Sequence, residues 1–177
     1  MYMENNDMKI DIKELIILLL GVVDRPITIF HLQYELFVLN ETKVDLNIIN
    51  EYVETIDNNS NNNNNNNNNN YSNTSNNKIR LNEKGKTYYD EIHNKYSSSN
   101  KHEKFKILLV VMKLIRNLYD KLTVEELAVL LYEDITEASA LIDGLNHNYK
   151  YKVIEGLYKK GYITEKRYRE LLSKFFT

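Results

Sequence analysis

Residues 78–89 read Lys-Ile-Arg-Leu-Asn-Glu-Lys-Gly-Lys-Thr-Tyr-Tyr, and within this stretch one kind of secondary structure gives way to another. The first four residues alternate polar with apolar side chains, which is typical of a half-buried strand. Asn82-Glu-Lys-Gly85 is a polar turn, after which Tyr88, Tyr89 and Ile92 recur at helical spacing. We therefore expect one short strand that leads directly into a helix.

Upstream of this stretch, capping residues and apolar spacing predict three helices. The first two are expected over residues 11–23 and 28–39, separated by Asp-Arg-Pro at 24–26, and the third over 45–57. The first helix contains the longest apolar run, Leu15–Val23, which is about half of the ~20 residues that cross a bilayer. Acidic residues precede this run where a signal peptide carries Lys or Arg, so we expect a fully buried helix in a cytoplasmic protein.

A low-complexity tract interrupts the chain. Residues 58–77 are asparagine except for three Ser, one Thr and one Tyr. Ordering such a tract costs backbone entropy, because it has almost nothing apolar to bury. We expect a mobile surface loop within an N-terminal domain of residues 1–96, and the polar run 96–101 is the expected linker to a helical domain of residues 97–177.

The second domain is expected to hold five helices. The first ends near Tyr119 and has Leu118 on its expected buried face. Thr123 and Glu126 have the spacing of a capping box, which opens the second helix. Gly161 is placed as the residue that ends the fourth helix in a left-handed conformation.

Three helices, a strand, a turn and a further helix follow one another in the order of a winged helix-turn-helix domain. The expected fold class is mainly α, with a winged helix-turn-helix-like N-terminal half that holds one short β-hairpin or strand, and a helical C-terminal half. The segment Ile79–Tyr89 is similar to the exit from the wing of many such domains. The pairs Leu32-Gln33 and Leu36-Phe37 and the segment Leu157–Thr164 resemble archaeal winged-helix proteins similar to the SocA-like (Panacea) antitoxin domain.

This resemblance implies a regulatory protein that binds DNA or a partner protein. The family usually carries an aromatic and Gly-Pro-Tyr-Ser segment between the third helix and the wing. Here the asparagine tract occupies that place. Recognition that depends on the Gly-Pro-Tyr-Ser segment is therefore not expected of this chain.

The charge distribution bears on whether DNA is a partner. Over 177 residues, 23 Lys and Arg face 25 Asp and Glu, and a net charge of -2 excludes nucleic-acid binding by bulk charge alone. A winged helix normally places its third helix in the major groove, but here the predicted third helix carries four acidic residues and no Lys or Arg. Four cations of the predicted wing and of the turn after it are placed either to contact phosphates or to form a solvated basic edge. These cations are Lys78, Arg80, Lys84 and Lys86.

A second basic segment lies at residues 150–177, where eight Lys and Arg face three Glu and alternate with tyrosines. Cations beside aromatic rings suit phosphate contact with base stacking. Tyrosine at helical spacing is more often half-buried core with lysines on the opposite face, and we favour this interpretation. The candidate DNA-binding residues of the segment are Lys159, Lys160, Lys166, Arg167 and Arg169.

Catalytic and metal-binding patterns are missing from the sequence. There is no Cys, and none of the four His has a second ligand at metal-binding spacing. The five Gly are scattered and form no phosphate-binding loop, and no Ser lies in a Gly-x-Ser-x-Gly elbow. His31 is expected to be a hydrogen-bonded core or rim residue. We predict no enzyme, no cofactor and no metal.

Two functions follow as expectations. The first is a non-enzymatic regulatory protein of winged-helix, antitoxin-like type that binds duplex DNA or a protein partner. The alternative is a protein–protein adaptor that keeps the winged-helix scaffold and has lost DNA reading. Neither expectation involves a membrane, and the sequence does not specify an oligomeric state.

Overall fold

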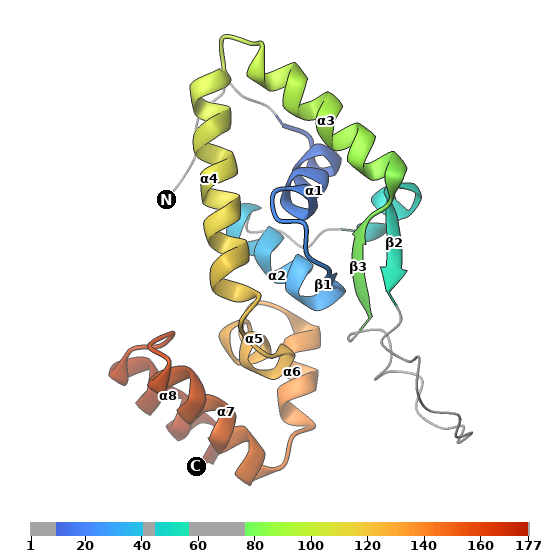
Figure 1. Ribbon diagram of the computed structural model, residues 1–177. Coiled ribbons are helices and arrows are strands. Elements are labelled where there is room, and N and C mark those ends of the chain that lie inside the picture. Colours follow the sequence, from blue (N-terminus) through green and yellow to red (C-terminus); the bar gives the residue numbers. More distant parts are fainter. Residues whose placement is uncertain (1–9, 41–44, 57–76, 177) are drawn as a thin grey trace, which may run out of the picture. The chain divides into compact units, whose positions relative to one another are not determined.

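In the computed structural model the chain is mainly helical and contains one small antiparallel sheet (Figure 1). The structure describes residues 10–40, 45–56 and 77–176, so the predicted loop at 58–77 lies almost entirely outside the described residues. The chain divides into two compact units, Met1–Asp120 and Lys121–Thr177. The predicted boundary after residue 96 differs from this one, because the helix that ends at Tyr119 belongs to the first unit.

Within its described residues the first unit begins and ends with a helix and contains three short strands between them. In chain order its elements are α1 (Ile12–Gly21), β1 (Ile27–Thr28), α2 (Ile29–Asn40), the 3₁₀-helix η1 (Leu46–Tyr52), β2 (Val53–Ile56), β3 (Lys78–Leu81), α3 (Glu83–Ser97) and α4 (His102–Tyr119).

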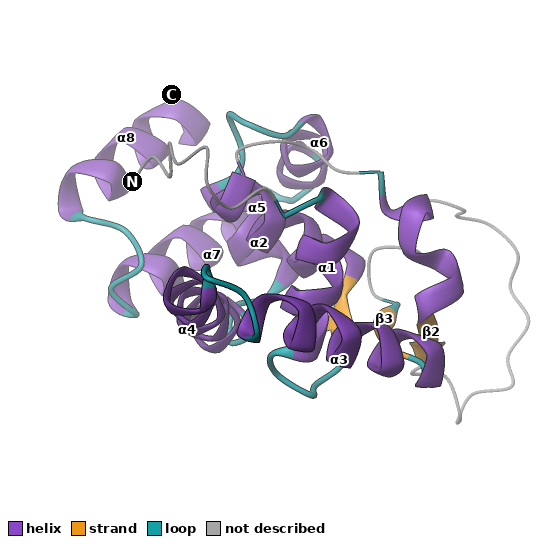
Figure 2. Ribbon diagram, turned by 90° about the horizontal axis from the view of Figure 1, so that it is seen from above, coloured by secondary structure: helices purple, strands orange, loops and turns teal. Residues whose placement is uncertain are grey.

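Helix α1 lies in the core of the first unit. The side chain of Asp11 accepts a hydrogen bond from the backbone N–H of Glu14 at 3.0 Å, so Asp11 caps α1 at the expected start of the first helix. Five consecutive residues, Ile16–Leu20, are at most 4% exposed, because α1 packs against α3, α4, η1 and β3. Figure 2 shows β3 beside α1 and α3. The predicted burial of the first helix is confirmed for Ile16–Leu20, whereas Leu15 and Gly21 are half-buried, and within the described residues no helix is long and apolar enough to span a membrane.

The three strands form an antiparallel sheet in the order β1-β3-β2. Ile27 of β1 pairs with Ile79 of β3, and Val53 of β2 pairs with Leu81. Strand β3 is therefore the central strand, and its alternation is the predicted one, since Ile79 and Leu81 are buried. The expected hairpin or strand is thus present as β2 paired with β3, and β1 is a third strand that was not predicted.

The predicted third helix over 45–57 is wrong. Asp45 does cap a helical segment, but η1 ends at Tyr52 and the chain continues as β2. The residues of β2, Val-Glu-Thr-Ile, are largely β-branched and favour a strand once a partner strand is available. That partner, β3, follows the asparagine tract in sequence, so local spacing alone does not reveal it.

The turn between β3 and α3 explains why residue 85 is a glycine. Asn82 caps α3 by accepting a hydrogen bond from the backbone N–H of Gly85 at 2.9 Å. A Cβ at Gly85 would lie 2.1 Å from the backbone oxygen of Tyr52. Glycine is therefore required here because the end of η1 approaches the first turn of α3 closely.

The second unit consists of four helices, in its described residues: α5 (Val124–Leu130), α6 (Thr136–Asp143), α7 (His147–Lys159) and α8 (Glu165–Phe176). Thr123 and Glu126 form the predicted capping box at the start of α5. Gly161 has a φ of 77° after α7, as predicted for a residue that ends a helix in the left-handed region. Helix α5 packs against both α6 and α7, and α7 packs against α8.

Candidate interaction surfaces

The hairpin cations, defined as Lys78, Arg80, Lys84 and Lys86, lie on exposed positions of β3 and the first turns of α3. Three of them are held by carboxylates of the same unit. Arg80 pairs with a carboxylate of β2 at 2.5 Å, Lys86 pairs with Glu83 at 2.8 Å, and Lys84 hydrogen bonds to a carboxylate of η1. In the part of the chain that the structure describes, Lys78 is the hairpin cation without a carboxylate partner.

The carboxylates that hold Arg80 and Lys84 are Glu54 and Glu51. The hydrogen bond with Lys84 lowers the pKa of Glu51 and raises that of the lysine, since each charge favours the ionised form of the other. A phosphate that took either cation from its carboxylate would leave that carboxylate unpaired beside another anion. The hairpin cations are thus exposed but already engaged.

The five candidate cations of the second unit are likewise paired, and the structure spreads them over the end of α7 and over α8. Lys159 pairs with Glu155 at 2.9 Å, Lys166 with Glu170 at 3.9 Å and Arg169 with Glu165 at 2.5 Å. All three pairs join residues four positions apart on one helix. Pairs of this kind are exposed and contribute little to stability.

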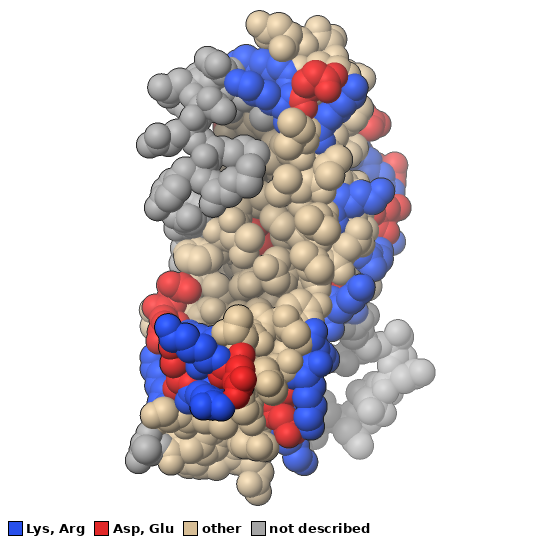
Figure 3. All heavy atoms as spheres, turned by 90° about the vertical axis from the view of Figure 1, so that its left-hand side faces the viewer, with Lys and Arg blue, Asp and Glu red and all other residues tan. Residues whose placement is uncertain are grey.

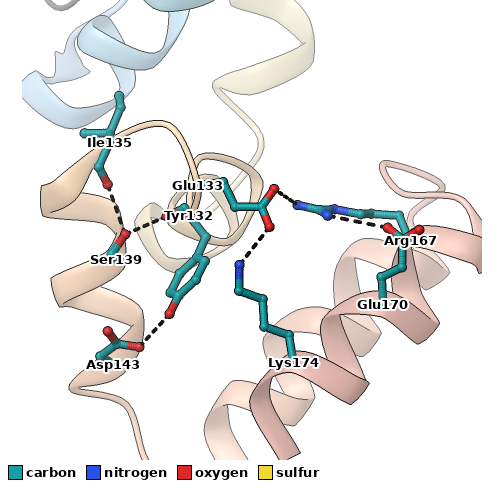
Figure 4. Close-up of polar contacts among 8 residues, drawn as sticks. All are labelled: Tyr132, Glu133, Ile135, Ser139, Asp143, Arg167, Glu170 and Lys174. Atoms are coloured by element: carbon teal, nitrogen blue, oxygen red, sulfur yellow. Dashed lines mark hydrogen bonds and ion pairs between the residues drawn. The ribbon is translucent and has the colours of Figure 1, made fainter.

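The other two candidate cations, Lys160 and Arg167, pair with carboxylates outside their own helix. Lys160 reaches both carboxylate oxygens of Glu126, at 2.6 and 2.9 Å, and Glu126 is also the acidic member of the α5 capping box. Glu133 accepts from Arg167 at 3.4 Å and from Lys174 at 2.7 Å, so one carboxylate holds two cations of α8 (Figure 4). These cations therefore form ion pairs between segments of the second unit that lie far apart in sequence.

The tyrosines of the second basic segment contact one another. Tyr158 and Tyr168 stack with ring centroids 4.7 Å apart, and the hydroxyl of Tyr168 donates to that of Tyr151 at 3.3 Å. This hydrogen bond is the first cause that raises the pKa of Tyr168 to about 12. Tyr149, Tyr151 and Tyr158 are exposed, contrary to the half-buried positions expected for them, whereas Tyr162 and Tyr168 are half-buried as expected. Tyr151 and Tyr158 both have ring partners.

A small pocket of about 280 Å³ lies in the first unit beside the start of α3. Tyr89 lines it together with three cations, Arg25, Arg80 and Lys86, and with two aspartates. Its volume is below the usual range of about 300–1,000 Å³ for small-molecule sites, and each of its cations is paired with a carboxylate. The pocket therefore offers no unpaired cation to an anionic ligand.

A buried charged cluster joins α2, α4 and the segment after α1. Glu35 and Arg116 are both 0% exposed, with Arg116 Nη1 3.8 Å from Glu35 Oε2. Arg116 also donates to the backbone oxygen of Arg25 at 2.8 Å, and Asp120 forms an ion pair with Arg25 at 3.1 Å. Sequence reasoning missed this cluster, although Glu35 stands out as the one acidic residue in the apolar helix over 28–39.

Burial sets the ionisation of this cluster. Burial is the largest cause that raises the pKa of Glu35 from 4.5 to about 8, and the nearby Asp120 adds to it, whereas Arg116 lowers it. At neutral pH Glu35 therefore carries a proton. Neither carboxyl group has a hydrogen-bond partner among the described residues, and the fully buried Glu35 is out of reach of a substrate.

The outward face of α4 is apolar. Ile107, Val110, Leu114 and Leu118 are exposed, which corrects the expected burial of Leu118. The opposite face of α4 is buried and supplies Phe105, among other residues, to the core. Figure 3 looks at the side of the molecule on which α4 lies in Figure 1, and uncharged surface covers much of that view.

The histidine prediction is confirmed at His31, which is buried, with its Nδ1 2.7 Å from the hydroxyl oxygen of Thr28. Among the described residues, no three His, Asp or Glu side chains are grouped so that they could hold a metal ion. Comparison of the chain with protein family models, with curated proteins and with solved structures finds no match. Function must therefore be argued from the surfaces themselves.

Proposed function

We propose that this chain is a non-enzymatic adaptor that keeps a winged-helix scaffold and acts by binding a protein partner rather than by reading DNA. The element order α1-β1-α2-η1-β2-β3 and the sheet order β1-β3-β2 support the winged-helix part of the proposal. In this scaffold η1 takes the place of the third helix, and the β2–β3 hairpin takes the place of the wing. The resemblance to SocA-like winged-helix proteins is part of the same proposal.

The observation that carries the proposal is the pairing of the candidate DNA-binding cations. Eight of the nine candidates have a carboxylate partner within the described residues, and Lys78 is the exception. Moreover, η1 contains one Glu and no Lys or Arg. Affinity for DNA comes largely from counterion release by cations that neutralise phosphates, so paired cations and an acidic reading segment favour a protein partner.

A DNA-binding regulator is the second candidate, because four cations gather on the hairpin and the start of α3, where a winged helix contacts phosphates. Binding to random duplex DNA, measured by fluorescence anisotropy at ~50 and ~200 mM salt, separates the two functions. The adaptor proposal predicts no measurable affinity at either salt concentration. An affinity that falls by about 10³-fold or more between them would overturn it, since such a fall requires several phosphate contacts.

A further inference from the structure

The outward face of α4 carries four exposed apolar side chains, which we call the α4 stripe: Ile107, Val110, Leu114 and Leu118. They are 55, 67, 57 and 43% exposed. Their spacing of three and four residues places them in one line along the helix, about 16 Å long at 1.5 Å per residue. A contiguous apolar surface of this kind on a helix is typical of a binding face rather than of scattered surface residues.

Basic side chains border the α4 stripe. Helical spacing places Lys106 and Lys113 along one edge and Lys104 along the other. Lys113 has no carboxylate partner within the described residues, and Lys106 pairs with Glu103 at 3.2 Å. Glu103 is the single acidic residue of α4, and it lies one turn before the stripe begins. The stripe is therefore apolar along its centre and positively charged at its edges.

We propose that the α4 stripe is the docking site for an acidic amphipathic helix of a protein partner. The inference rests on the proposed adaptor function and names the surface and the chemistry of the partner. An amphipathic helix with apolar residues at the same spacing would cover the four side chains, and its flanking Glu and Asp would meet the lysines. The charges at the edge set the choice of partner more than the affinity.

A second copy of this chain is a poorer occupant. In an antiparallel pair of α4 helices the same edge of each copy faces the other, so the edge that carries Lys106 and Lys113 would face the same basic edge of the second copy. Stable dimers bury about 20–30 residues on each side, whereas the stripe offers four apolar side chains.

The test uses the full chain and two labelled peptides of about 14 residues, enough for four helical turns. Both are held helical by side-chain bridges and carry Leu at the spacing of the α4 stripe. One has Glu along its flanks, and its matched control has Lys instead. Anisotropy at ~50 mM salt should show about tenfold tighter binding of the acidic peptide, because two exposed charge pairs change from attractive to repulsive between the peptides.

Two variants make the test specific to α4. The double variant Lys106→Glu with Lys113→Glu should invert the preference of the protein for the two peptides. Val110→Asp should weaken both peptides by more than tenfold, and its exposed position keeps the fold intact, which circular dichroism checks. Binding of the acidic peptide that neither variant changes would overturn the proposal, since it would locate the peptide elsewhere.

Other outcomes also count against the stripe. Equal binding of both peptides, or binding of neither, would exclude an acidic helix as its occupant. A dimer in sedimentation that Val110→Asp dissociates would assign the stripe to a second copy. Failure of the stripe is distinct from failure of the adaptor function, because only strong, salt-sensitive DNA binding by the unchanged protein overturns the latter.

Discussion

The buried carboxyl group of Glu35 makes the stability of the first unit depend on pH. In the folded chain its pKa is raised from 4.5 to about 8, mainly because burial disfavours the charged form. Below pH 4.5 Glu35 is protonated in both the folded and the unfolded chain. Between pH 4.5 and 8 it is protonated mainly in the folded chain, and above pH 8 it is ionised in both. Its stabilising contribution is therefore complete below 4.5 and is lost as the pH rises through 8.

The size of the effect follows from proton linkage. Between the two pKa values the free energy of unfolding should fall by about 1.4 kcal/mol for each pH unit, or on the order of 3–4 kcal/mol between pH 5 and 8. The charges that face Glu35 are those of Arg25, Arg116 and Asp120. The variant Glu35→Gln stays neutral at every pH. Its stability should lack this contribution to the pH dependence.

The assay is urea unfolding of both proteins between pH 5 and 9. Other titrating groups are shared, so the difference in unfolding free energy between the two proteins isolates residue 35. Glu51→Gln serves as the control, because the pKa of Glu51 is lowered by Lys84 and this residue is ionised throughout the range. Parallel pH profiles for Glu35→Gln and the unchanged protein would refute a protonated Glu35.

Three further predictions concern particular residues. Gly85→Ala should destabilise the first unit by about 2–4 kcal/mol in urea unfolding, because its Cβ would meet the backbone oxygen of Tyr52. In the control Gly144→Ala the new Cβ meets only ordinary contacts at 3.5 Å, so this variant should be neutral or stabilised by up to about 1 kcal/mol. Equal effects of the two substitutions would contradict the packing at Gly85. Thr123→Ala should cost about 1 kcal/mol of unfolding free energy through loss of the α5 cap, and an unchanged melting curve would show that the capping box does not contribute. Glu51→Gln combined with Glu54→Gln should release Lys84 and Arg80. The affinity for DNA at low salt should then rise, and the slope of log affinity against log salt should steepen by roughly one to two. Unchanged binding would mean that pairing is not what keeps these cations from phosphates.

Local patterns in the sequence sufficed for much of the fold. Caps such as Asp11 and Thr123 satisfy backbone groups within three residues, so their geometry can be read directly from spacing. The same holds for the alternation of β3 and for Gly161 after α7. Each of these features depends on near neighbours in sequence.

Features that depend on distant partners escaped prediction. The local spacing of β2 predicts a helix, because its partner β3 lies beyond the asparagine tract. The cluster of Glu35 and Arg116 unites α2 with α4, and nothing local marks the two residues as a pair. The carboxylates opposite Arg80, Lys84 and Lys160 also come from other elements, so the sequence showed the candidate cations but not that they were engaged.

The central claim is that this chain acts through a protein that contacts α4 and not through DNA. The most direct test is a nuclear magnetic resonance titration of the isotope-labelled full chain, once with the acidic helical peptide and once with random duplex DNA. The account predicts that the peptide shifts amide signals of residues 106–118, while DNA shifts neither these nor the signals of Lys78–Leu81. Shifts of the hairpin signals with DNA, and none of the α4 signals with the peptide, would contradict it.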